Sequence, residues 1–226
     1  MDAPAPSPLR PAVAELVGTG LLAAIVVGSG IMAQRLAGPI EALALLCNAL
    51  ATGAGLVALI LTFGPVSGAH FNPVVTVVSA LDGDLRWKHV PAYLLAQICG
   101  GVGGVVLAHG MFKLPLISLS GHPRTGPGQW LAELVATAGL VGTIGVVSRR
   151  TPAATPYAVA AWIVAAYWFT SSTSFANPAL TLARAFTDTF AGIRLGDAPA
   201  FVVVQFLGGG LALLGRRWLL AERRSS

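Results

Sequence analysis

Two Asn-Pro pairs, each inside an otherwise apolar stretch, constrain the fold of this chain more than any other feature. They are Asn72-Pro73 and Asn177-Pro178, and each follows a short loop of small and polar residues. Asn is a preferred N-cap and Pro is preferred at the first helical position, so each pair predicts the start of a helix. Both starts fall where hydropathy predicts membrane. Because unpaired backbone groups cost several kcal/mol in hydrocarbon, such loops persist only where they line a cavity or are covered by protein.

The composition is that of a polytopic membrane protein. Hydrophobic residues make up 55% of the chain and charged residues 10%, and the mean hydropathy is +0.75. A soluble domain carries about a quarter charged residues. The length of 226 residues suits one compact bundle, so we expect a single transmembrane domain over residues 1–226. Much of the net charge of +5 lies in short loops and the tail, where it sets topology, so it does not indicate a nucleic-acid partner.

Apolar runs of about 20 residues predict the membrane-spanning helices. They cover about 11–33, 42–63, 90–110, 129–148 and 199–219, and a shorter run at about 155–170 completes six spans. The segments that begin at the two Asn-Pro pairs, about 72–82 and 177–188, are too short to cross a membrane. We expect them to be re-entrant half-helices, so the predicted fold is an all-α membrane protein.

The two halves of the chain, about 11–110 and 129–217, repeat one another. Three motifs occur once in each half and in the same order, namely Glu15–Thr19 and Glu133–Thr137, Asn72-Pro73 and Asn177-Pro178, and Gln97–Gly101 and Gln205–Gly209. Three spans per half is an odd number, so the copies must insert with opposite orientation. An inverted repeat brings the N-termini of the two half-helices face to face near the midplane, the arrangement of a transport pathway.

The distribution of Lys and Arg predicts that both chain ends lie in the cytoplasm. In this orientation more basic residues lie inside than outside, as the positive-inside rule requires. Those expected inside are Arg10, Arg86, Lys88, Arg149, Arg150, Arg216, Arg217, Arg223 and Arg224. Those expected outside are Arg35, Lys113, Arg124, Arg184 and Arg194.

With these paired motifs the chain resembles the major intrinsic proteins, the aquaporins and aquaglyceroporins, from about Pro11 to Arg217. The resemblance implies an aquaporin-like fold of six transmembrane helices and two re-entrant half-helices. It implies a passive channel for small neutral solutes in a bacterial-type inner (plasma) membrane, with one pore in each subunit of a homotetramer embedded in membrane lipid. No cofactor or metal is expected, and no nucleophile–base pair indicates an enzyme.

The two half-helix starts are the expected centre of the pore, and the dipoles of the half-helices make that region positive, which repels cations and protons. The carbonyl of each Asn caps its helix, which leaves the amide free to donate into the pore. The central motif consists of Asn72, Pro73, Val74, Asn177, Pro178 and Ala179. By resemblance, backbone carbonyls line the pore at Gly68, Ala69, His70, Thr173, Ser174 and Phe175.

The expected outer constriction, or selectivity filter, departs from the family pattern. The family continues Asn-Pro-Ala-Arg, whereas Leu180 stands at the arginine position here. Counting twenty residues back from the first Asn, and twelve and three back from the second, gives the other filter positions as Thr52, Ala165 and Ser174. None of the four is aromatic or charged, which predicts a wide, neutral, amphipathic filter. It resembles the filters of a bacterial subgroup associated with arsenic resistance, so arsenite (arsenous acid), related metalloids and glycerol-like polyols are the expected solutes.

Arg184 has two interpretations. It lies four residues after Leu180, nearly on the same helix face and about 6 Å further along the axis. It either reaches the outer vestibule and partly replaces the missing cation, or it caps the end of the half-helix or pairs with Asp188.

Glu15 and Glu133 are the second open point. As buried acids they could form a proton relay, or their carboxylates could support the re-entrant loops by accepting backbone hydrogen bonds. The competing functions are therefore an ordinary water channel and, in a different class, a proton-coupled secondary transporter that uses these two residues. A non-conducting membrane protein is a third.

Overall fold

The computed structural model describes residues 9–221, with side chains through residue 218, and this part of the chain contains helices and no strands. Arg223 and Arg224, together with the two chain ends, lie outside the described residues. In chain order the α-helices are α1 (Leu9–Ala37), α2 (Glu41–Ser67), α3 (Pro73–Leu81), α4 (Val90–Met111), α5 (Pro127–Arg150), α6 (Thr155–Phe169), α7 (Pro178–Ala183) and α8 (Ala198–Ala221). Short 3₁₀ turns lie at Trp87–His89, Pro152–Ala154 and Arg184–Phe186.

Five of these helices, α1, α2, α4, α5 and α8, are long and apolar enough to cross a membrane. The sixth predicted span, α6, has 15 residues and rises about 22 Å. The helix begins at Thr155, with Pro156 in its first turn, and ends at Phe169, where Thr170 turns to an extended conformation. The predicted all-α fold of six spanning segments and two half-helices is confirmed.

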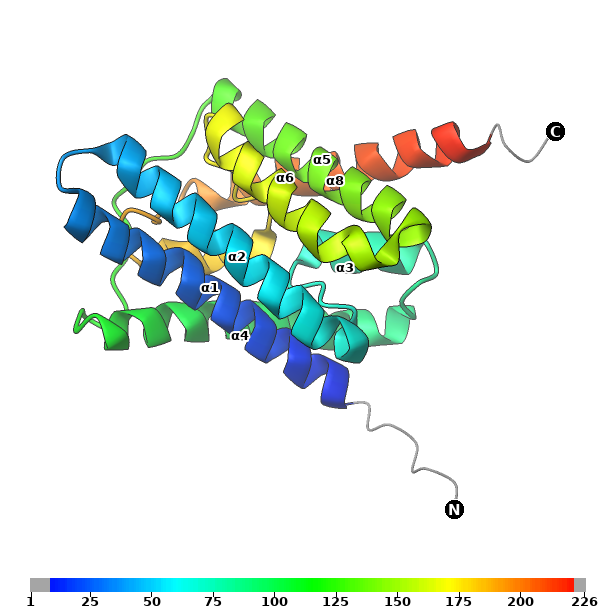
Figure 1. Cartoon of the computed structure of the whole chain (residues 1–226), viewed down its shortest axis with the longest axis horizontal. Coiled ribbons are helices and arrows are strands. Elements are labelled where there is room, and N and C mark those ends of the chain that lie inside the picture. The colour runs from blue at the N-terminus through cyan, green and yellow to red at the C-terminus, as the bar shows by residue number, and fades with distance from the viewer. Residues whose placement is uncertain (1–8, 222–226) are drawn as a thin grey trace, which may run out of the picture.

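The helices pair as an inverted repeat. In the first half α1 packs along α2 and α4, and in the second half α5 packs in the same way along α6 and α8. The two halves meet through α2 and α6, and each half-helix touches the last helix of both halves. Figure 1 shows the long helices running side by side along one direction, with α3 near one end of the bundle.

Glycines let the first and last helices of each half approach closely. A Cβ at Gly100 or Gly104 of α4 would overlap backbone carbonyls of α1, and one at Gly208 of α8 would lie 2.5 Å from the Leu134 carbonyl oxygen of α5. In contrast, Gly103 has no atom of the described chain near its missing Cβ. The glycine clusters therefore contribute to packing only at the positions that face the partner helix.

The second half-helix is shorter than predicted. Instead of continuing to residue 188, α7 ends at Ala183 and is followed by one 3₁₀ turn, Arg184–Phe186. The loop between α4 and α5 explains the early end, because Ser120 and Ser118 donate their backbone N–H groups to the carbonyls of Ala185 and Phe186. These carbonyls have partners outside the helix, so the helix does not need to extend to satisfy them.

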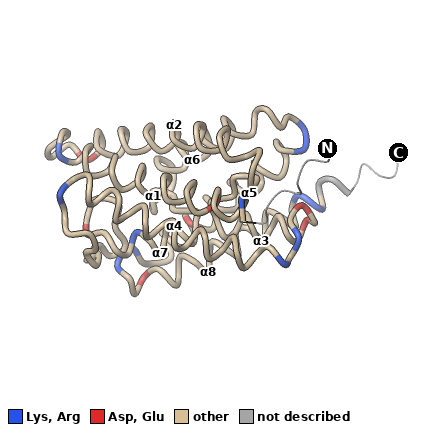
Figure 2. Tube along the Cα trace, turned by 90° about the horizontal axis from the view of Figure 1, so that it is seen from below, with Lys and Arg blue, Asp and Glu red and all other residues tan. Residues whose placement is uncertain are grey.

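Charge is concentrated at the two ends of the bundle, and the stretch between them is mostly uncharged (Figure 2). The start of α1 and the end of α8 lie at the same end of the molecule (Figure 1). Large apolar side chains are exposed along the outer faces of the long helices, for example Leu95, Leu131 and Val203. An apolar belt between two charged ends is the surface that a bilayer covers.

Candidate functional site

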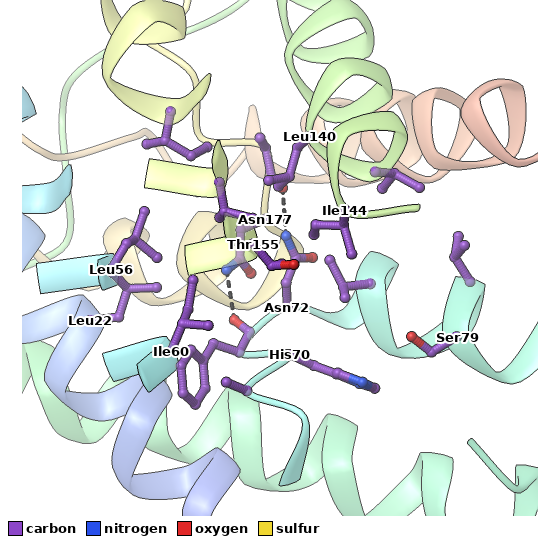
Figure 3. Close-up of a pocket in the computed structure, with 18 of the residues that line it drawn as sticks. Leu22, Leu56, Ile60, His70, Asn72, Ser79, Leu140, Ile144, Thr155 and Asn177 are labelled. Atoms are coloured by element: carbon purple, nitrogen blue, oxygen red, sulfur yellow. Dashed lines mark hydrogen bonds between the residues drawn. The ribbon is translucent and has the colours of Figure 1, made fainter. Parts of the chain in front are cut away.

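A cavity of about 270 Å³ runs through the middle of the bundle. It reaches from Tyr167, near the end of α6, to Asp82 at the end of α3. Figure 3 shows Leu22, Leu56 and Ile60 on one side of its middle and Leu140 and Ile144 on the other. Most of the wall is therefore apolar, and polar groups come mainly from the two re-entrant loops and from the cavity ends.

Asn72 and Asn177 lie together in the centre of this cavity (Figure 3). Each caps the half-helix that follows it: Oδ1 of Asn72 accepts from the N–H of Val74 at 3.0 Å, and Oδ1 of Asn177 accepts from the N–H of Ala179 at 3.0 Å. Both Asn residues have extended backbones, and Pro follows each at the first helical position. The local sequence thus fixes both helix starts.

The amide groups of the two Asn residues cross between the repeats. Nδ2 of Asn72 donates to the carbonyl of Ala176, and Nδ2 of Asn177 donates to the carbonyl of Phe71, both at 2.7 Å. The expectation that each amide is free to donate into the pore is therefore only half correct. An amide has two N–H donors, and one on each Asn is already used. One donor per Asn remains for a molecule in the cavity.

The two re-entrant loops adopt a backbone that L-residues rarely adopt. Ala69 and Phe71 in the first loop have φ of 50°, and Thr173, Ser174 and Ala176 in the second have φ of 60°, 52° and 46°. Non-glycine residues in this left-handed region cost on the order of 1–3 kcal/mol each. Such loops persist only when their surroundings hold them in place.

Two fully buried carboxylates hold these loops at equivalent positions. Glu15 accepts the backbone N–H groups of His70 and Phe71 at 2.9 and 2.7 Å. Glu133 accepts those of Phe175 and Ala176, both at 2.8 Å. In each case the two donors are the residues directly before the Asn.

Each carboxylate is in turn held by the glutamine of its own repeat. Gln97 donates to Glu15 at 2.7 Å and to Thr76 at 2.8 Å. Gln205 donates to Glu133 at 2.7 Å, and Ser67 adds a fourth hydrogen bond to Glu15. Neither carboxylate lines the cavity.

The part of the cavity near the end of α6, where the outer constriction was expected, is lined by Thr52, Ser174 and Leu180, but not by Ala165. Ala165 is exposed on the outside of α6, and Tyr167 occupies the wall instead. Positions 165 and 167 are two residues apart, which is about 200° around a helix, so their side chains point to nearly opposite sides. The prediction that this ring contains no aromatic side chain is therefore wrong.

Tyr167 bridges two helices across this ring. Its hydroxyl lies 3.3 Å from Oγ1 of Thr52, which joins α6 to α2. The hydroxyl of Ser174 has no hydrogen-bond partner among the described residues. Hydroxyl groups and the apolar side chain of Leu180 together make an amphipathic, uncharged ring.

Arg184 also lines the cavity, beyond Leu180. It does not pair with Asp188, whose carboxylate accepts from the N–H of Gly121 at 3.0 Å and lies 3.7 Å from His122. The guanidinium stacks on the ring of Phe175, with 3.3 Å between its central carbon and the ring centroid. Arg184 stands at the C-cap of α7 and its side chain also lines the cavity, so of the predicted contacts only the pair with Asp188 is wrong.

The end of the cavity near α3 carries a cluster of paired charges. The carboxylate of Asp82 forms ion pairs with Arg149 at 3.4 Å, with Arg217 at 3.7 Å and with Arg216, and Asp84 pairs with Arg149 at 3.1 Å. These contacts tie the end of α3 to α5 and α8. Sequence reasoning did not connect these residues, because they lie in three separate segments of the chain.

A family model described as "Major intrinsic protein" matches residues 3–164. The chain belongs to the major intrinsic protein family. It is 55% identical over 215 residues to the aquaglyceroporin AqpS of Rhizobium meliloti, covering 95% of this chain and 92% of that protein. It is also 29% identical to the probable aquaporin TIP2-2 of Oryza sativa, covering 93% of this chain and 87% of that protein.

The fold is that of a solved member. The X-ray structure of the aquaglyceroporin from Plasmodium falciparum superposes with a TM-score of 0.71 at 22% identity, covering 92% of this chain and 95% of that one. As a major intrinsic protein with five long apolar helices, the chain is an integral membrane protein and a passive channel for small neutral solutes. Membership of this family places it among channels rather than enzymes.

The remaining predicted pore residues of this major intrinsic protein divide into two groups. Gly68, Ala69, His70 and Phe175 line the cavity, whereas Thr173 does not. Pro73, Val74, Pro178 and Ala179 do not line it either. The buried side chain of Val74 packs against α8, where it fills the space beside Gly209.

No group of three or more potential metal-ligating side chains occurs within residues 9–221. His70 lies at the cavity wall, and its Nδ1 is 3.1 Å from Oγ1 of Thr76. This contact ties the re-entrant loop to the half-helix that follows it.

Proposed function

We propose that this channel conducts neutral, oxygen-rich solutes larger than water, with arsenous acid and glycerol-like polyols as its principal substrates. The observation that carries the proposal is the uncharged ring of Thr52, Tyr167, Ser174 and Leu180 at the outer part of the cavity. Its hydroxyl groups match the hydroxyl groups of a triol, and Leu180 offers an apolar surface. Replacing a solute's hydration shell with such groups at modest cost is the requirement for any filter.

Arsenous acid and glycerol have the same chemical features that this ring must recognise. Both are uncharged at neutral pH, and both carry three hydroxyl groups around a compact centre. A guanidinium at the position of Leu180 would fill the ring and add a charge, whereas leucine leaves the ring neutral. Identity of 55% to a protein named an aquaglyceroporin supports a solute range beyond water.

The alternative of a proton-coupled transporter is not supported by the contacts of Glu15 and Glu133. Glu15 accepts four hydrogen bonds and Glu133 three, all from loop and neighbouring groups. A carboxylate whose two oxygens are both engaged in this way, outside the cavity, stabilises a loop rather than carrying protons. Transport through this chain is therefore expected to be independent of a pH gradient.

The assembly and topology that we propose follow from the same reasoning. The chain forms a homotetramer in the inner (plasma) membrane, with one pore per subunit and both termini in the cytoplasm. The basic residues Arg149, Arg216 and Arg217 lie in one cluster at the end of the cavity formed by α3, α5 and α8, which supports placing that end inside.

The test is stopped-flow light scattering on proteoliposomes exposed to an inward gradient of arsenous acid or glycerol. The wild-type chain is expected to re-swell as the solute enters. Leu180→Arg is expected to lower both solute permeabilities about tenfold, which corresponds to one added barrier of about 1.4 kcal/mol. Leu180→Met, which conserves volume and neutrality, is the matched control and should behave as wild type. Wild-type vesicles that shrink quickly but never re-swell would identify a channel for water alone and refute the proposal.

A further inference from the structure

The guanidinium of Arg184 is the one feature of the cavity that the uncharged ring does not explain. Leu180 occupies the position of a family arginine, yet a cationic side chain lies one helical turn further along the same pathway. Arg184 is only 4% exposed, although it has no acidic partner among the described residues. A buried charge without a partner is costly, so its position needs a reason.

The position of Arg184 is fixed on two sides. Nε donates to the carbonyl of Ala191, and the guanidinium plane lies against the ring of Phe175. Phe175 is itself held, because its N–H donates to Glu133 at 2.8 Å and its ring meets that of Phe201 edge to face at 5.4 Å. Stacking on an aromatic ring stabilises a guanidinium, most strongly when the pair is desolvated. The side chain is therefore held in one geometry.

The terminal nitrogens of Arg184 make no hydrogen bond to any residue of the described chain, in contrast to its neighbour Arg124. Arg124 lies 5.0 Å from the centroid of the same ring, but its guanidinium donates to the carbonyls of Gly192, Ser172 and Phe190. Arg124 does not line the cavity, whereas Arg184 does. The arginine that faces the pathway is therefore the one whose terminal N–H groups are unused.

We propose that Arg184 is a specificity-determining residue of this channel. Its terminal N–H groups donate to the oxygen atoms of passing neutral solutes, and its charge repels cations. The planar fork of a guanidinium presents fixed donors to two neighbouring oxygens, which suits polyols and oxyacids better than single water molecules. This inference rests on the proposed function in naming those solutes. The exclusion of cations rests only on the buried, unpaired charge.

The experiment compares wild type with Arg184→Met and Arg184→Lys in proteoliposomes. Permeabilities to glycerol, arsenous acid and water are measured by light scattering, and proton and sodium leaks are measured with trapped fluorescent dyes. Arg184→Met should lower the ratio of solute to water permeability about tenfold, because a charge-assisted hydrogen bond is lost. It should also raise the cation leak. Arg184→Lys keeps the charge without the fork, so it should lower the ratio by about threefold while cations remain excluded.

The matched control is Arg35→Met. Arg35 also stacks on a phenylalanine, with 5.1 Å to the centroid of the Phe112 ring, and donates to a backbone carbonyl, but it is exposed and does not line the cavity. The control should leave all permeabilities unchanged. Size-exclusion profiles show whether each variant is folded. If Arg184→Met does not fold, Arg184→Lys provides the test.

Two results separate this inference from the proposed function. If wild type passes solutes and Arg184→Met has the same solute-to-water ratio and the same cation leak, the inference is wrong and the proposed function stands. If wild type passes only water, the proposed function fails, and an unchanged cation leak in Arg184→Met would overturn the role of Arg184 as well.

Discussion

Replacing Glu133 by glutamine tests whether the re-entrant loop is held by a carboxylate. One oxygen of Glu133 accepts from Phe175, and the other accepts from both Ala176 and Gln205. A glutamine has one acceptor oxygen instead of two. It retains two of the three hydrogen bonds if that oxygen takes the place next to Ala176 and Gln205. The N–H of Phe175 then faces an amide NH₂. A lost hydrogen bond to a charged acceptor costs about 1.5–3 kcal/mol, and the two remaining bonds become neutral and weaker. Relief from burying a charge offsets part of this, so we expect a loss of about 3 kcal/mol.

Thermal unfolding in detergent, followed by the loss of the folded size-exclusion peak, measures this loss. For a chain of this length, about 3 kcal/mol corresponds to roughly a 6–12 °C lower midpoint. Glu15→Gln should behave similarly, because Glu15 makes the equivalent contacts in the other repeat. Glu41→Gln, at an exposed site in the first turn of α2, is the control and should change stability by less than about 0.5 kcal/mol. An unchanged midpoint in Glu133→Gln, or solute flux that requires a pH gradient in wild type and stops in the variant, would refute the structural role.

Two further predictions concern packing and acid stability. Gly104→Ala should lower the free energy of unfolding by about 1–3 kcal/mol or prevent assembly, since the new methyl group would overlap a backbone carbonyl of α1. The control is Gly103→Ala, which should be tolerated because the site is open. Equal yields of folded protein from the two variants would contradict the packing argument. Burial alone raises the pKa of Asp197 in the loop before α8, but hydrogen bonds from Arg194 and from the N–H of Arg124 outweigh it and hold this pKa below its usual value of 3.8. The stability that Asp197 contributes is therefore complete above pH 3.8 and is lost as the pH falls through its lowered pKa, so Asp197→Asn should flatten the acid limb of the midpoint measured against pH.

The fold was predictable because its signals are local and occur twice. Each spanning segment is read from hydropathy, and each half-helix start from an N-cap followed by Pro, which need no knowledge of distant residues. Repetition of the motifs then fixed the topology, because three spans in each half force an inverted arrangement. The end of α7 was not predictable, since it depends on hydrogen bonds from Ser118 and Ser120 of the loop between α4 and α5.

The uncharged ring was predicted at three positions but not at the fourth, and the reason is geometric. Counting back from Asn177 to α6 passes through residues 170–176, an irregular loop with three left-handed residues. Counting across such a loop does not preserve the helical phase. The count was therefore wrong by two residues and gave Ala165 as the wall residue in place of Tyr167. Leu180 is reached from Asn177 within α7 alone, and the count from Asn72 to Thr52 crosses only the shorter loop 68–71; both Thr52 and Leu180 line the cavity.

The crossed hydrogen bonds at the centre show why the chemistry of the pore belongs to the assembled molecule rather than to either motif. Glu15 fixes Phe71, and the carbonyl of Phe71 then receives the amide of Asn177 from the other half. Glu133 fixes Ala176 in the same way, and its carbonyl receives the amide of Asn72. Each Asn therefore caps the half-helix of its own repeat, and its amide group is oriented by a carbonyl of the opposite repeat. With the carbonyl oxygen of both Asn residues committed to helix capping, the groups they offer the cavity are N–H donors. A molecule at the centre meets N–H donors from both Asn residues, so we expect a water or hydroxyl group there to accept from them and not to relay a proton.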